Sequence, residues 1–179
     1  VPFDSVRKSM SVITMINKQP IAIVKGAPET LLENCNNCDK EKTLRALALS
    51  NLTVIYIKQS LGRLSALCGC VIASTGAACG LVYLRGGDYE QICAAIKNMI
   101  GNITGMVCDG AKVGCAMKVA SGVSSALQSA VLAREGMCIS EHDGIIEKDI
   151  EKTIQNLGKI GSVGMQHTDD MILDIMVCK

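Results

Sequence analysis

The residues best suited to metal chemistry are two cysteines, Cys108 and Cys115, which enclose the segment Asp109-Gly110-Ala111-Lys112-Val113-Gly114. The two glycines let backbone N–H groups approach a bound group, and a helix that begins after the segment favours negative charge at its N-terminus. Cysteine thiolates are soft metal ligands. The spacing alone leaves two interpretations open, because buried cysteines also serve as small apolar residues in a core rich in alanine and glycine.

The other residues with possible chemical roles give weaker patterns. Cys35 and Cys38 have the spacing of a redox or zinc pair but lack a second pair of ligands, so we interpret them as the end of a loop. His142 and His167 have mainly polar neighbours in the sequence and share no ligand motif, so they are predicted to be exposed. Lys112 and Lys118 could pair with a negatively charged metal cluster or with a substrate carboxylate. Lysines that are simply exposed to solvent are the commoner case.

The chain has ten cysteines, and two environments could explain them. Disulfides would require secretion, but the first residues lack the basic and apolar regions of a signal peptide. The sequence therefore predicts a reduced, cytoplasmic protein. Its 18 basic and 17 acidic residues give a net charge of +1, which offers no basic surface for nucleic acid.

Composition and periodicity predict a mainly α fold: a compact domain of small-residue-rich helices with an N-terminal β-hairpin appendage. Aromatic residues make up only 2% of the chain, so its core must be built from small and aliphatic side chains. Residues 9–16 and 21–24 read as strands joined by a turn at 17–20, and Pro28 marks a short helix. We predict a domain boundary after residue 38.

From residue 39 to 179 the pattern is helical. We expect a largely buried helix over 41–60, a capping pair at Asp88 and Gln91, and further helices over 113–133, from Asp143 and from Thr168. Glycines at 158, 161 and 164 are predicted to break the helix that begins at Asp143.

The uncharged stretch Leu64–Leu84 is long enough to span a membrane. Its glycine, alanine, serine, threonine and cysteine content would make insertion only modestly favourable, so we favour a buried helix. In that case Gly69, Gly76 and Gly80 should mark close helix contacts.

Several segments resemble the cluster-binding C-terminal part of the L-cysteine desulfidase and iron–sulfur L-serine dehydratase family. They are Gly62-Arg63-Leu64-Ser65-Ala66-Leu67-Cys68-Gly69-Cys70, Cys108-Asp109-Gly110-Ala111-Lys112 with Cys115-Ala116-Met117-Lys118, Ile160-Gly161-Ser162-Val163-Gly164-Met165, and Asp170-Met171-Ile172-Leu173-Asp174-Ile175-Met176. The resemblance covers residues 39–179. It implies a [4Fe–4S] cluster held by Cys68, Cys108 and Cys115, with Cys70 as a competitor for the first position.

The same resemblance implies an amino-acid β-elimination lyase. Its products would be pyruvate and ammonia, with sulfide in addition when L-cysteine rather than L-serine is the substrate. The family carries its proton-abstracting cysteine in a larger N-terminal part that these residues do not match, so we assign no catalytic residue here. We therefore expect a catalytically impaired portion, and leave open two partners for it: a second copy in a homo-oligomer, or a missing N-terminal chain.

Residues 1–37 resemble a different family, the nucleotide-binding domain of P-type cation ATPases. Pro2-Phe3-Asp4-Ser5-Val6-Arg7-Lys8 and Lys25-Gly26-Ala27-Pro28-Glu29 carry this resemblance, which implies that Phe3 stacks on adenine and that Lys8 and Lys25 lie along the nucleotide. The alternative function is thus an ATP-binding fragment of a cation pump. The phosphorylation motif Asp-Lys-Thr-Gly-Thr does not occur in the sequence, so pumping itself is excluded.

Overall fold

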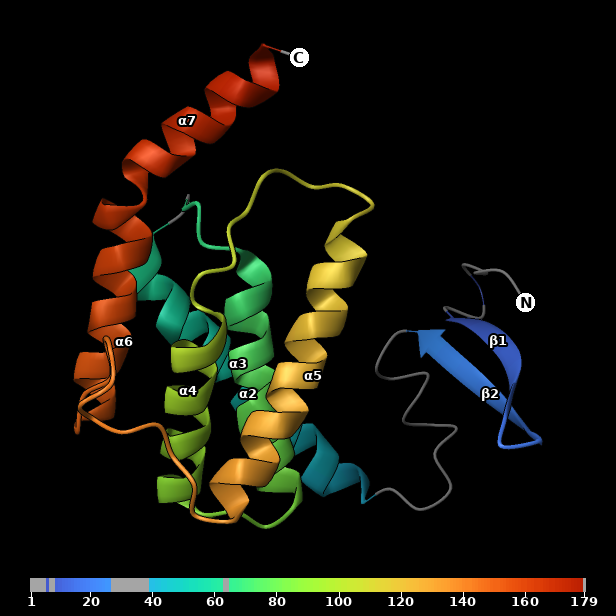
Figure 1. Cartoon of the computed structure of the whole chain (residues 1–179). Helices are drawn as coiled ribbons and strands as arrows, with labels where there is room; N and C mark the ends of the chain where they lie inside the picture. Colours follow the sequence, from blue (N-terminus) through green and yellow to red (C-terminus); the bar gives the residue numbers. More distant parts are fainter. Residues whose placement is uncertain (1–5, 7–8, 27–38, 63–64, 179) are drawn as a thin grey trace. The chain divides into compact units, whose positions relative to one another are not determined.

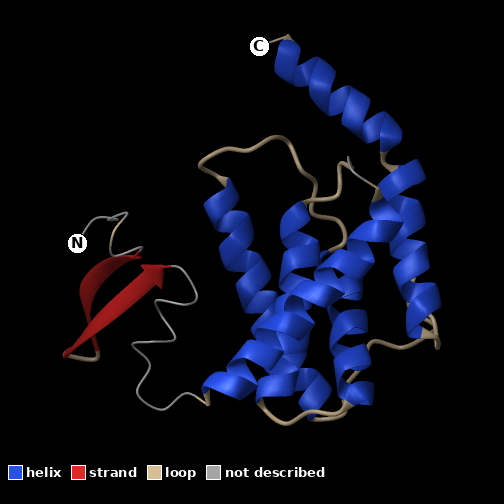
Figure 2. Cartoon of the chain, turned by 180° about the vertical axis from the view of Figure 1, so that it is seen from behind, coloured by secondary structure: helices blue, strands red, loops and turns tan. Residues whose placement is uncertain are grey.

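The computed structural model describes residues 6, 9–26, 39–62 and 65–178. The chain divides into two compact units, Val1–Thr43 and Leu44–Lys179. Figure 2 shows the described strands in the first unit and helices through most of the second. The mainly α prediction with a hairpin appendage is confirmed.

The hairpin consists of β1 (Ser9–Ile16) and β2 (Gln19–Gly26), paired antiparallel so that Ile16 lies opposite Gln19. Asn17 and Lys18 have φ angles of 50° and 64°, which is the left-handed geometry of a two-residue hairpin turn. The turn is shorter than the predicted 17–20 because Gln19 and Pro20 already pair with β1. The helix predicted at Pro28, together with Cys35 and Cys38, lies outside the described residues.

Six α-helices and one π-helical turn are described in the rest of the chain. They are α2 (Lys40–Leu61), α3 (Gly69–Leu84), α4 (Tyr89–Ile103), α5 (Cys115–Arg134), α6 (Ile150–Lys159), η1 (Ile160–Gly164) and α7 (Gln166–Val177). The predicted capping pair is confirmed, because the Asp88 side chain accepts the Gln91 amide and the Gln91 side chain accepts the Asp88 amide.

Helix α3 is enclosed by its neighbours, as predicted. A Cβ atom at Gly76 would lie 2.5 Å from the carbonyl oxygen of Ser50, and one at Gly80 would lie 3.0 Å from the carbonyl oxygen of Ala46. The prediction for Gly69 is wrong, since a Cβ atom there would meet nothing within 4 Å. Among the described residues, no helix combines the length and the apolar character that crossing a membrane requires.

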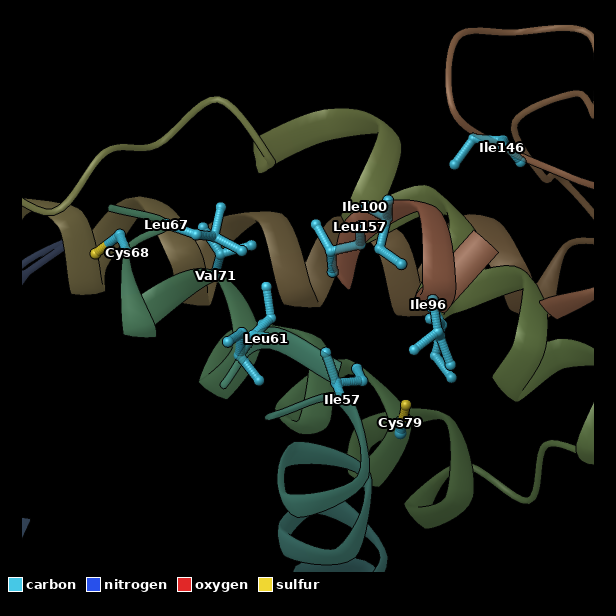
Figure 3. Close-up of a cluster of buried hydrophobic side chains, with 12 residues drawn as sticks. Ile57, Leu61, Leu67, Cys68, Val71, Cys79, Ile96, Ile100, Ile146 and Leu157 are labelled. Atoms are coloured by element: carbon cyan, nitrogen blue, oxygen red, sulfur yellow. The ribbon is translucent and has the colours of Figure 1, made fainter. Parts of the chain in front are cut away.

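The core joins aliphatic side chains of helices α2, α3, α4 and α6. Figure 3 shows Ile57 and Leu61 from α2 beside Val71, Ile96 and Leu157 from α3, α4 and α6. Small residues of α5 line a second cluster against α3 and α4, namely Ala126, Ala130 and Ala133. Because alanine side chains are short, these three helices pack closely without aromatic residues.

Three predictions about the helices need correction. Leu44, Leu52 and Ile55 are 55%, 64% and 55% exposed, so α2 is buried along one face only. Helix α3 begins at Gly69 rather than Leu64, because residues 66–68 pair with another segment instead. Helix α6 begins at Ile150 rather than Asp143, after a positive φ of 60° at Gly144 and a cap by the Asp149 side chain on the Glu151 amide.

Helix α6 ends at Lys159, within the glycine series at 158, 161 and 164, as predicted. Residues 160–164 form a π-helical turn that joins α6 to the segment leading into α7. Gly158 packs on Ser60, and Gly161 packs on Leu61. The first two glycines therefore allow close approach to the end of α2.

Candidate metal centre

A short backbone pairing brings Cys68 and Cys108 onto neighbouring segments. Leu67 and Val107 form an antiparallel bridge. The Cys68 amide donates to the Met106 carbonyl at 2.9 Å, and the Cys108 amide donates to the Ala66 carbonyl at 2.6 Å. Successive side chains alternate between the two faces of such a pairing, so both cysteines lie on the face opposite Leu67 and Val107.

Two of the three predicted cysteines lie at helix N-termini. Cys68 is the N-cap residue of α3, and Cys115 is the first residue of α5. Figure 1 shows that these two helix ends lie at the same end of the bundle. The unpaired N–H groups of a helix N-terminus carry partial positive charge and stabilise thiolates. The Cys68 sulfur points away from Leu67 and Val71 (Figure 3).

Cys115 is separated from Cys108 by the loop 109–114. Its half-buried thiol lies 3.7 Å from the Gly110 carbonyl oxygen, and Gly110 has a φ of 89°. In the described part of the chain, no three Cys, His, Asp or Glu side chains come together closely enough to hold a metal ion. The backbone pairing thus places Cys68 and Cys108 on adjacent segments, and the convergence of all three thiols stays a prediction.

Two lysines, Lys112 and Lys118, pair with the Asp109 carboxylate at this loop. The Lys118 ammonium donates to the Val107 carbonyl at 2.7 Å and to Asp109 Oδ1 at 2.6 Å. Lys112 pairs with the other carboxylate oxygen. Hydrogen bonds from Lys112 and Lys118 hold the pKa of Asp109 well below its usual range, and the bond to Asp109 raises the pKa of Lys118.

Cys70, the competitor for the first ligand position, takes part in helix packing. Its thiol donates to the Lys118 carbonyl at 3.2 Å and lies 3.6 Å from Ser74 Oγ, between α3 and α5. Gly122 on α5 leaves the space for this contact, because a Cβ atom there would lie 2.8 Å from the Cys70 sulfur. This arrangement favours Cys68 over Cys70 as a ligand.

A pocket of about 420 Å³ lies beside the loop. Residues 109–112 form one wall, and Ile172, Ile175 and Met176 of α7 form the other. Sequence reasoning missed this pocket because α7 reaches the loop only through tertiary packing, which leaves no local pattern. Its lining combines the ion pair of Lys112 and Asp109 with apolar side chains.

The remaining described cysteines and histidines lie away from this pairing. Cys79 and Cys93 are buried free thiols, whereas Cys138 and Cys178 are exposed. Burial raises the pKa of Cys79 to about 12 despite a hydrogen bond involving Thr53. His142 and His167 are exposed, as predicted.

Comparisons with known proteins point to one family. The family model for the serine dehydratase alpha chain matches residues 21–174. A UPF0597 protein of Porphyromonas gingivalis is 62% identical over 177 residues, covering 88% of this chain and 41% of the relative. Another, of Phocaeicola vulgatus, is 57% identical over 157 residues, covering 88% of this chain and 36% of the relative. No solved structure matches the chain.

The fold and the match together define the class: the chain belongs to the serine dehydratase alpha family. It spans less than half the length of the relatives described above. The match begins at residue 21, inside the segment that resembles the pump domain. The ATP-binding alternative gains no support from these matches, and Phe3 and Lys8 lie outside the described residues.

Proposed function

We propose that this chain is the cluster-binding portion of an amino-acid β-eliminating lyase, with Cys68, Cys108 and Cys115 holding a [4Fe–4S] cluster. The observation that carries the proposal is the pairing of residues 66–68 with 106–108, which brings the segments of Cys68 and Cys108 side by side although they are forty positions apart in sequence. Family membership supports serine dehydratase-like chemistry. The proposed substrates are L-serine, giving pyruvate and ammonia, and L-cysteine, giving sulfide in addition.

The donor set fits such a cluster. All three thiols are free, and the helix ends at Cys68 and Cys115 provide positive partial charge for an anionic group. A cubane with three protein thiolates leaves one iron open as a Lewis acid for a substrate carboxylate or leaving group.

The chain's own residues would then bind and orient the substrate. Lys112 lines the pocket beside the loop and would exchange its partner Asp109 for a substrate carboxylate. Ile172, Ile175 and Met176 line the other side with apolar surface. We assign no proton-abstracting group to these residues, and propose that it lies in the part of the relatives that this chain does not span.

Anaerobic reconstitution tests the proposal. The purified chain, incubated with iron and sulfide and then desalted, should absorb at roughly 400 nm and retain about four iron and four sulfide per chain. A chain that retains neither would contradict cluster binding. Zinc bound in place of iron after the same treatment would point to a structural thiolate site instead.

A further inference from the structure

Lys118 contacts the chain on both sides of Cys108. Its ammonium reaches the carbonyl of Val107 and the carboxylate of Asp109, the residues immediately before and after that cysteine. Lys118 itself follows Cys115 by three positions on α5, so the two side chains lie on the same helix face. One side chain therefore ties the segment of one predicted ligand to the helix of another.

The second lysine of the network provides an internal comparison. Lys112 pairs only with Asp109, and its side chain is 48% exposed, against 24% for Lys118. Exposed ion pairs contribute little to stability. The Lys118 ammonium is better shielded and also satisfies a backbone carbonyl, and such charge-assisted hydrogen bonds are about twice as strong as neutral ones.

The charges around the loop also favour a bound anion. Two ammonium groups surround one carboxylate, so the network carries one net positive charge beside the helix ends at Cys68 and Cys115. A cubane held by three thiolates in its oxidised form is negatively charged. Losing either lysine removes the same charge, but only Lys118 also holds the backbone at Val107.

We infer that Lys118 is a positioning residue that fixes Cys108 against α5, so that its thiol and that of Cys115 can share one metal cluster. The cluster in this inference rests on the proposed function. The contacts of Lys118 with Val107 and Asp109 are present in the chain without a cluster. Lys118 acts through Cys108 rather than on a substrate. The two hydrogen bonds of Lys118 stabilise the segment 107–109 against local opening.

The decisive comparison is between Lys118→Met and Lys112→Met. Each variant removes one positive charge next to Asp109, but only the first breaks the bond to Val107. In the chain without a cluster, hydrogen–deuterium exchange at the amide of Cys108, which donates to the Ala66 carbonyl, should become about tenfold faster in Lys118→Met. We expect less than about a threefold change in Lys112→Met, because exposed pairs are weak. Lys118→Arg should restore slow exchange, since it keeps the donors and the charge.

Reconstituted protein gives a second readout. Release of iron to a chelator should be about tenfold faster in Lys118→Met than in the unsubstituted chain, and the visible circular dichroism of the cluster should change shape. Lys112→Met should keep the original spectrum. Equal effects of the two variants would show that only charge matters and would overturn the inference, as would unchanged exchange in Lys118→Met.

The two proposals fail in different ways. If the unsubstituted chain binds no cluster, the proposed function is wrong, and exchange at the Cys108 amide still decides whether Lys118 holds this segment in place. If the chain binds a cluster but Lys118→Met releases it at the original rate, the inference is wrong and the proposed function stands. Far-ultraviolet circular dichroism of each variant confirms that it is folded.

Discussion

Gly76 on α3 packs against the backbone of Ser50 on α2, and a Cβ atom at position 76 would be 2.5 Å from the Ser50 carbonyl oxygen. A backbone carbonyl inside a helix cannot rotate aside as a side chain can. The contact therefore fixes how closely α2 and α3 approach. Helix α3 begins at Gly69 and Cys68 is its N-cap, so the same contact helps to position this predicted ligand.

Gly76→Ala should destabilise the fold by about 1–3 kcal/mol, because overpacking forces the two helices apart. Denaturant-induced unfolding followed by circular dichroism measures the change. Gly69→Ala on the same helix is the matched control, because its Cβ atom meets nothing within 4 Å. Alanine in a helix is favoured over glycine by up to about 1 kcal/mol, so the control should be neutral or stabilised. Equal losses in both variants would contradict the close-packing argument.

The ligand assignment predicts a clear pattern among four cysteine variants. Cys68→Ala, Cys108→Ala and Cys115→Ala should each lose most of the iron that the reconstituted chain retains, because a missing thiolate exposes a second iron. Cys70→Ala should keep its iron, since that thiol is bonded to the Lys118 carbonyl. Iron and sulfide analysis after desalting gives the result. Loss in Cys70→Ala with retention in Cys68→Ala would reverse the assignment.

Cys79 predicts how stability responds to alkaline pH. Burial raises its pKa from 9.0 to about 12 in the folded chain, so above pH 9 the unfolded chain loses this proton more readily than the folded one. The contribution is fully present below pH 9 and declines as pH rises toward 12, by at most about 1.4 kcal/mol per pH unit. Unfolding free energies at pH 8, 9 and 10 should therefore decline less steeply in Cys79→Ala than in the unsubstituted chain. Parallel declines would contradict this prediction.

The sequence predicted best those features that depend on neighbouring residues. The capping pair at Asp88 and Gln91 and the hairpin turn after Ile16 are set by local hydrogen bonds and backbone geometry, and both were predicted. Helix ends near glycine were predicted less well. Gly144 marks a turn before α6, whereas Gly158 and Gly161 serve contacts with α2, and only tertiary structure distinguishes these roles.

Long-range relationships around the candidate site left no local signal. Nothing in the periodicity of residues 66–68 indicated that they pair with 106–108, so the helix was predicted to begin too early. The burial of α2 was overestimated for a similar reason. Leucines at 44 and 52 fit a helix pattern, but whether a neighbour covers them depends on the packing of other segments. The resemblance to a family supplied the ligand set, which spacing alone left undecided.

The last prediction is that these 179 residues, carrying a cluster, show little turnover when assayed by themselves. The chain covers 36% and 41% of two relatives in the same family, and none of its residues is assigned as the base that removes the α-proton. General-base catalysis contributes about 10²–10⁴-fold, and holding a base against the substrate adds a further large factor. Cluster binding needs only thiolates, so it should survive without turnover.

Pyruvate release from L-serine, and pyruvate and sulfide release from L-cysteine, under anaerobic conditions provide the measurement. We expect rates close to those of buffer containing iron and sulfide, even when the chain's absorbance at roughly 400 nm is fully developed. Adding a separately produced chain that corresponds to the uncovered part of a relative should restore turnover, because it would supply the base. Sustained turnover by these residues alone, abolished in Cys108→Ala, would contradict the prediction and locate the base within this chain. The same rate in Cys108→Ala would instead indicate a contaminating enzyme, because that variant lacks a proposed cluster ligand.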